Sequence, residues 1–145
     1  PYFPGAPEYV VGTFNIRFAS NDGAEAWPNR CHRVADQVAF SRLDLVGMQE
    51  VLAQQVDHFK VLLPEYQWVG VGRNDGVRDG EFALIGFRRS SFVLMESGNF
   101  WLSETPDTPS KGWDAVNFRI ATFVVLRPKS LVPQPLFILI NTHLD

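Results

Sequence analysis

The sequence predicts an α/β fold, in which buried strands alternate with amphipathic helices. Leu45 to Met48 forms a short apolar run, which is typical of a strand that is covered on both faces. Apolar residues recur at helical spacing on both sides of this run, and β-branched and aromatic runs follow later in the chain. Such an order of strands and helices favours a sheet that is covered by helices.

The composition fits one compact unit of 145 residues, of which 46% are hydrophobic, enough to form a core. Sixteen acidic and thirteen basic side chains give a formal charge of -3, so the chain has no general attraction to nucleic acid or anionic lipid. A phosphate-bearing substrate must therefore be held locally, by a cation or a few basic groups. Cys31, the single cysteine, cannot form an internal disulfide, and no apolar run approaches the roughly 18 residues of a membrane span.

The first strand is expected at Tyr9 to Phe14, a β-branched and apolar stretch. It follows a proline-rich start, residues 1–8, which is expected to be extended. Asn15 comes directly after the strand. An asparagine in that place is either a turn former or a ligand.

A first helix is expected to begin near Trp27, because Pro28 suits a first helical turn. It is interpreted as a crossover between two parallel strands. Arg30 and Arg33 flank its apolar stripe and are interpreted as a solvated face. The stripe comprises Cys31, Val34 or Ala35, and Val38.

Glu50 follows the buried run at 45–48, where its carboxylate either binds a metal or caps the next helix. That second helix is predicted by apolar residues four, three and four positions apart, and Pro64 closes it. Its apolar stripe comprises Leu52, Val56, Phe59 and Leu63. His58 lies off the stripe and is expected to be an exposed helical histidine.

Five further strands are predicted, and polar residues adjoin three of them. Glu81 and Arg119 directly precede strands and His143 follows the last one; Arg119 is either a strand-edge ion pair or a bidentate ligand of a phosphoryl group. The strand at 92–101 is expected to pair with that at 82–87, and the last strand is expected to be buried. The long loop at 102–114 is either a binding loop or simply mobile. The strands are Tyr66 to Val71, Phe82 to Phe87, Phe92 to Trp101, Ile120 to Leu126 and Leu136 to Thr142.

Five side chains at or beside strand ends, Asn15, Glu50, Glu81, Arg119 and His143, suit metal-assisted hydrolysis of a phosphate ester. Mg²⁺ prefers oxygen ligands and keeps several waters, so Glu50 and Asn15 suffice to hold it. Arg119 would bind a phosphoryl oxygen, and His143 would donate a proton or hydrogen bond once Glu81 fixes its tautomer. The chain has no Cys/His spacing for zinc, no Walker loop and no serine elbow.

Five short motifs resemble, in order and approximate spacing, those of the endonuclease/exonuclease/phosphatase superfamily. This group includes pancreatic-type DNase, exonuclease III-like repair nucleases, inositol polyphosphate 5-phosphatases, sphingomyelinases and deadenylases. The similarity extends from Tyr9 to Asp145, and residues 101–106 and 110–114 resemble an uncharacterised bacterial and fungal branch. The motifs are Thr13-Phe14-Asn15-Ile16-Arg17, Met48-Gln49-Glu50-Val51, Gly80-Glu81-Phe82, Arg119 before an apolar strand, and Asn141-Thr142-His143-Leu144-Asp145.

The resemblance implies a DNase I-like fold with four layers, α/β/β/α, in which two sheets pack face to face and each half of the molecule contributes one sheet. It also implies roles for the five side chains. Glu50 binds Mg²⁺, or alternatively Mn²⁺, with help from Asn15, which also belongs to the phosphate-binding and catalytic sets. Glu81 pairs with His143 at the scissile phosphate, and Arg119 contacts that phosphate.

The family's later motifs are an Asp-x-Asn that aligns the attacking water and a terminal Asp-His pair. Neither is present, because no Gly-Asp-x-Asn occurs and Asp57-His58 lies inside the second expected helix. Residues 1–145 are therefore expected to be the N-terminal portion of a single domain, inactive alone, with the remaining C-terminal half as a partner. Leu52 and Asp79 stand where pancreatic-type DNases place an arginine and a tyrosine against the minor groove. This departure disfavours general cutting of duplex DNA.

Three hypotheses remain open. The first is a Mg²⁺-dependent phosphoesterase, in which a metal-assisted water attacks nucleic acid or a small phosphorylated molecule. No membrane partner is expected. The second is a truncated or inactive binding module that acts through the 101–114 loop, where Trp113 either stacks on a base or sugar or simply packs. The third is an unrelated α/β domain with coincidental polar strand ends. No compartment is indicated, and a start at Pro1 fits a removed signal peptide or an excised fragment.

Overall fold

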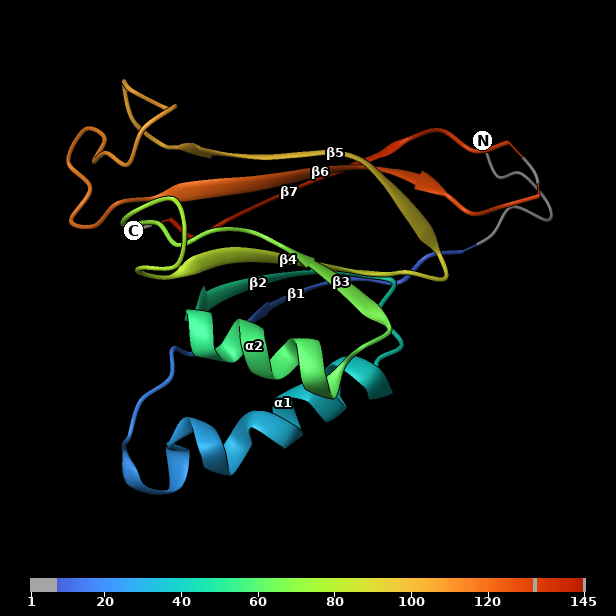
Figure 1. Cartoon of the computed structure of the whole chain (residues 1–145), viewed down its shortest axis with the longest axis horizontal. Coiled ribbons are helices and arrows are strands. Elements are labelled where there is room, and N and C mark those ends of the chain that lie inside the picture. Colours follow the sequence, from blue (N-terminus) through green and yellow to red (C-terminus); the bar gives the residue numbers. More distant parts are fainter. Residues whose placement is uncertain (1–7, 132, 145) are drawn as a thin grey trace.

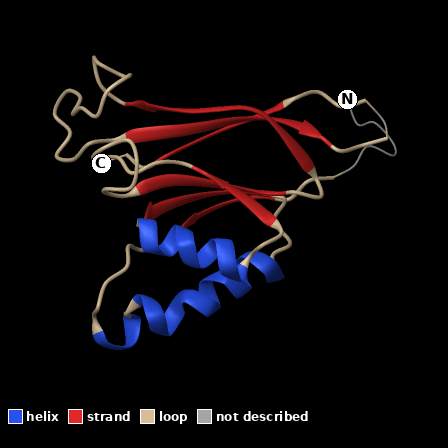
Figure 2. Ribbon diagram, in the orientation of Figure 1, coloured by secondary structure: helices blue, strands red, loops and turns tan. Residues whose placement is uncertain are grey.

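The structure is a computed structural model that describes residues 8–131 and 133–144, so the conformation expected for residues 1–7 and the motif residue Asp145 lie outside the described residues. The described elements form three layers, namely two α-helices, a four-stranded sheet and a three-stranded sheet (Figures 1 and 2). In chain order they are β1 (Val11–Asn15), η1 (Gly23–Glu25), α1 (Trp27–Phe40), β2 (Leu45–Val51), α2 (Ala53–Leu62), β3 (Tyr66–Val69), β4 (Phe82–Arg88), β5 (Phe92–Trp101), β6 (Ile120–Pro128) and β7 (Phe137–Thr142).

The first sheet has the strand order β1-β2-β4-β3, and the second has the order β5-β6-β7. β1 and β2 are parallel and α1 connects them, which confirms the expected crossover helix. All other neighbours are antiparallel. Both α-helices cover the outer face of the first sheet (Figure 2). No described helix covers the outer face of the second sheet.

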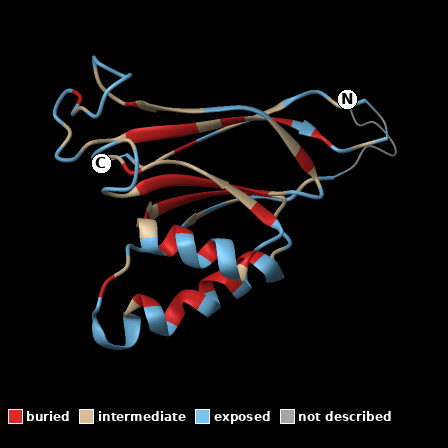
Figure 3. Ribbon diagram, in the orientation of Figure 1, coloured by how far each residue is buried: buried red, intermediate tan, exposed pale blue. Residues whose placement is uncertain are grey.

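The central strands β2 and β4 are buried on both faces, as the apolar run at 45–48 predicts (Figure 3). Successive side chains of a strand point to opposite faces. Val46 and Met48 therefore join the core beneath the helices, whereas Leu45 packs with Ile85 and Phe87 between the sheets. Among the described residues, no helix is both long and apolar enough to cross a membrane.

The strand at 92–101 is confirmed, but its expected pairing with the strand at 82–87 is wrong. β4 already pairs with β2 along one edge and with β3 along the other, so neither edge can accept β5. β5 pairs with β6 in the second sheet instead. The described residues thus contribute strands to both sheets, which corrects the expectation that each half of the molecule supplies one sheet.

The burial expected for the last strand is also wrong. β7 lies at an edge of the second sheet, and the described helices cover the first sheet. Ile138 and Ile140 are 68% and 58% exposed on its outer face, while Asn141 is only 6% exposed. The apolar residues of this strand therefore do not indicate that both of its faces are buried.

Asn141 connects the two sheets. From β7 its Nδ2 donates to the carbonyls of Met48 on β2 and Leu84 on β4, at 2.8 and 2.9 Å. Its Oδ1 accepts a hydrogen bond from Gln49 Nε2 at 2.7 Å. A Cβ atom at Gly47 would lie 2.9 Å from this oxygen, so the glycine gives the amide room to approach the first sheet.

Replacing Asn141 with leucine, which has a similar shape, should lower the free energy of unfolding by about 2 to 3 kcal/mol, because three buried hydrogen bonds are lost. Urea denaturation of the complete protein measures this. The control is Thr122→Val at the neighbouring position on β6, where one bond to Asn99 stays within a sheet. It should cost about 1 kcal/mol. Equal losses in the two variants would contradict a special role for the connection between the sheets.

Candidate active site

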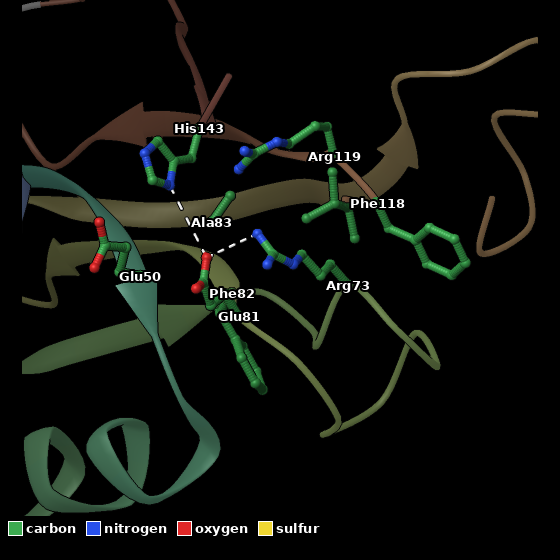
Figure 4. Close-up of a pocket in the computed structure, with 9 residues that line it drawn as sticks. Glu50, Arg73, Glu81, Phe82, Ala83, Phe118, Arg119 and His143 are labelled. Carbon is green, nitrogen blue, oxygen red and sulfur yellow. Dashed lines mark hydrogen bonds and ion pairs between the residues drawn. The ribbon is translucent and has the colours of Figure 1, made fainter. Parts of the chain in front are cut away.

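The structure brings the five predicted side chains together. Glu50, Glu81, Arg119 and His143 line one pocket (Figure 4), and Asn15 is hydrogen-bonded to Glu50 at its edge. They come from the ends of β1, β2, β4, β6 and β7, so strand pairing gathers residues that are distant in the sequence. The pocket is further lined by Arg73 and by the largely apolar residues Phe82, Ala83, Phe118 and Ile120.

The Glu50 carboxylate is held by two donors. Asn15 Nδ2 lies 2.8 Å from Oε1, and the backbone N–H of Phe18 lies 3.2 Å from Oε2. Asn15 Oδ1 accepts the backbone N–H of Arg17 at 3.0 Å. Each oxygen keeps a free lone pair, so an oxygen-preferring cation fits this pair.

The donor set suits a metal that needs few protein ligands. Among the described residues, no group of three or more His, Cys, Asp or Glu side chains is arranged to hold a metal ion. Mg²⁺ is commonly bound by one or two carboxylates together with waters and substrate oxygens, and Glu50 with Asn15 meets that requirement.

The backbone around Glu50 is unusual. Glu50 has φ +61° at a β-bulge between Met48 and Val51, and Arg17 has φ +59°. Positive φ is uncommon for such residues, and bulges often redirect a side chain beside an active site. The alternative role of Glu50 as a helix cap is wrong, since its carboxylate bonds to Asn15 and Phe18.

Gln55 performs the capping instead. Its Oε1 accepts the backbone N–H of Leu52 at 2.8 Å, which satisfies a donor before the first turn of α2. Its Nε2 donates to the carbonyl of Arg17 at 3.0 Å. The fully buried Gln55 side chain thus connects the helix to the segment that carries the Glu50 partners.

Arg30 is buried, which corrects its assignment to a solvated face of the first helix; it is 6% exposed. Its guanidinium donates to four backbone carbonyls, those of Ile16, Arg17, Phe18 and Glu25. Burial, with the nearby Arg17 cation, lowers the pKa of Arg30 below its ordinary value. The side chain therefore fixes the turn that presents the Phe18 N–H to Glu50.

Glu81 is placed between two partners. Arg73 Nη1 lies 2.7 Å from Glu81 Oε2, and His143 Nδ1 lies 4.0 Å from the same oxygen (Figure 4). The second distance is too long for a hydrogen bond. His143 Nδ1 is buried and has no hydrogen-bond partner among the described residues. A movement of about 1 Å would give it one, and such bonds often tighten only when substrate binds.

Arg73 was not among the predicted site residues. It lies two residues after the end of the predicted strand at 66–71, in a loop whose glycines and Asn74 indicate only a turn. The rule that found Asn15 and Glu50, polar residues at strand ends, would also have selected it. His58 is exposed as expected and accepts a hydrogen bond from Trp27 Nε1 at 2.8 Å, and Trp113 is 76% exposed.

Replacing Arg30 with methionine should destabilise the protein by about 2 to 4 kcal/mol, because one buried and three partly buried hydrogen bonds to backbone carbonyls are lost. Arg33→Met is the matched control, since Arg33 is exposed on the same helix. Thermal and urea unfolding of the complete protein measure both variants. If Arg33→Met destabilised the protein as much as Arg30→Met, the loss of stability would not come from the hydrogen bonds of Arg30 to residues 16–18.

The chain is similar to several known proteins. An endonuclease/exonuclease/phosphatase from Bacteroides vulgatus shares 41% identity, with a TM-score of 0.88 over 92% of this chain and 51% of that chain. A mannosyl-6-phosphatase from Bacteroides thetaiotaomicron shares 38% identity, with a TM-score of 0.89 over 95% of this chain and 52% of that chain. An uncharacterised protein of Acanthamoeba polyphaga mimivirus is 27% identical over 94 residues, which are 57% of this chain and 14% of that protein.

No protein-family model matches the chain. The two solved proteins are about twice its length, so the chain spans about half of each. Their fold confirms the DNase I-like architecture predicted from the five motifs, over the half that is aligned.

Proposed function

Because the chain belongs to the endonuclease/exonuclease/phosphatase family by sequence identity and by fold, we propose that it forms part of a metal-dependent phosphoesterase. The observation that carries this proposal is the convergence of Glu50, Glu81, Arg119 and His143 on one pocket, with Asn15 bonded to Glu50. Two acids, an amide, a guanidinium and an imidazole are the groups needed to hold a cation and a phosphoryl group together.

Each side chain has a proposed role. Glu50 and Asn15 hold Mg²⁺ or Mn²⁺, which would neutralise the charge that develops on the phosphoryl group and assist the attacking water. Arg119 binds a non-bridging phosphate oxygen. His143 donates a hydrogen bond or proton to the phosphoryl group while Glu81 orients its ring.

Small phosphorylated molecules are the proposed substrates. The mannosyl-6-phosphatase at 38% identity acts on a phosphorylated sugar, as its name states. The chain carries a net charge of -3, and Leu52 and Asp79 replace the groove-binding residues of pancreatic-type DNases. These features favour a compact phosphorylated metabolite over duplex DNA.

We also propose that residues 1–145 are the N-terminal portion of a single domain whose C-terminal half supplies the water-aligning Asp-x-Asn motif and the Asp-His pair. This chain alone would then be inactive. The alternative is an inactive binding module of the same fold. A phosphoester panel on the complete protein, with Mg²⁺, Mn²⁺ and EDTA arms, separates them: turnover that EDTA abolishes supports the enzyme, and phosphate binding without turnover supports the module.

Glu50→Gln should weaken Mg²⁺ affinity and lower turnover together, because an amide replaces the carboxylate ligand. The loss of affinity should be at least about tenfold, the effect of losing even a residue that supports a ligand. Calorimetric titration with Mg²⁺ measures binding, and Glu96→Gln, an exposed position on β5, serves as the control. Unaltered Mg²⁺ binding by Glu50→Gln would rule out the metal assignment.

His143→Gln should lower kcat by about 10²- to 10⁴-fold, the usual contribution of a proton donor. Mg²⁺ affinity should stay within about twofold of the original, since His143 contacts Glu81 and not the Glu50 pair. Steady-state kinetics and the same titration test this. A variant that loses metal binding as well would place the imidazole at the cation.

A further inference from the structure

We propose that Arg73 is a second phosphate-binding guanidinium and that, with Arg119, it makes the pocket selective for phosphomonoesters over phosphodiesters. This inference rests on the proposed phosphoesterase function. It names both the substrate class and a residue that determines it.

The position of Arg73 supports this role. Arg73 and Arg119 point into the pocket from one side, and Glu50 and His143 lie on the other (Figure 4). The Arg73 side chain is 14% exposed, and its Nη1 bonds to Glu81. Within the described part of the chain its guanidinium makes no other hydrogen bond, so further N–H groups remain to bind a ligand.

Hydrogen bonds fix the backbone of the loop that carries Arg73. The Arg73 N–H donates to the carbonyl of Glu81 at 3.1 Å, and Trp101 Nε1 donates to the carbonyl of Arg73 at 2.7 Å. Further along, Asp75 Oδ1 accepts the N–H groups of Val77, Arg78 and Asp79, and these bonds lower the pKa of Asp75. Binding a ligand through Arg73 therefore requires little further ordering of its backbone.

The number of cationic donors favours a phosphomonoester. Two guanidiniums line the pocket, and each can donate to terminal phosphate oxygens. A phosphomonoester carries about -1.5 to -2 charges at neutral pH and has three terminal oxygens. A phosphodiester has one negative charge and two such oxygens, so it has fewer acceptors for two guanidiniums and a cation.

The ion pair with Glu81 suggests a competing role, in which Arg73 only positions Glu81. The two roles differ in their consequences. Glu81 would orient the same His143 for either class of ester, so losing a purely positioning residue would slow both hydrolyses alike. Losing a phosphate-binding residue would slow the hydrolysis of the monoester more.

The experiment compares p-nitrophenyl phosphate with bis(p-nitrophenyl) phosphate as substrates of the complete protein, with inorganic phosphate as a competitive inhibitor. Arg73→Gln should lower the monoester-to-diester ratio of kcat/KM at least about tenfold and raise the Ki of phosphate. Arg73→Lys should restore part of both, because lysine binds phosphate as a point charge. Arg78→Gln is the matched control, because this exposed arginine of the same loop pairs with Asp57 at 2.6 Å. It should leave the ratio unchanged.

An unchanged ratio in Arg73→Gln, whether both rates fall or neither does, would overturn the inference and leave the phosphoesterase proposal standing. An unchanged Ki of phosphate would overturn it as well. If the original protein hydrolyses neither ester and calorimetry detects no phosphate binding, the proposed function itself fails. The melting temperature of each variant identifies loss of fold, and in that case Arg73→Lys decides the outcome.

Discussion

The buried amide of Asn141 is the interaction on which the site geometry depends. It joins β7 to the carbonyls of Met48 and Leu84, on the two central strands of the other sheet. Met48 is two residues before Glu50, Leu84 is three after Glu81, and Asn141 is two before His143. One side chain therefore fixes three of the strands that carry the acids and the imidazole. Apolar packing between the sheets is less directional and would tolerate small relative shifts.

A second constraint acts along the chain at the cation site. Glu50 and Arg17 both have left-handed backbone conformations, which cost free energy and persist only when the surroundings enforce them. Hydrogen bonds hold the backbone of this segment in place, since Arg30 donates to the carbonyls of residues 16–18 and Gln55 donates to that of Arg17. The two helices thus contribute more than a cover for the sheet. Through Arg30 and Gln55 they hold the turn at 16–18, whose Phe18 N–H binds the Glu50 carboxylate.

The sequence predicted most of what is local. Apolar periodicity located both α-helices and all seven strands, and residue types at strand ends identified four residues that line the pocket and Asn15, which bonds to one of them. It failed where the outcome depends on distant segments. Arg30 lies beside an apolar stripe, and its burial follows from the turn at 16–18 that covers it. The partner of the 92–101 strand depends on both edges of β4 being occupied, which no local pattern reveals.

Arg73 shows that the net charge of a chain does not reveal the charge inside one pocket. The net charge of -3 suggests that anions are disfavoured, yet exposed charges are screened beyond about 8 Å at physiological salt. Arg73 is mostly shielded from solvent and pairs with Glu81, so its interaction with a nearby anion is screened less. The field that a bound phosphate meets is then set by the groups that line the pocket. An acidic chain can bind a phosphomonoester because two guanidiniums line this pocket.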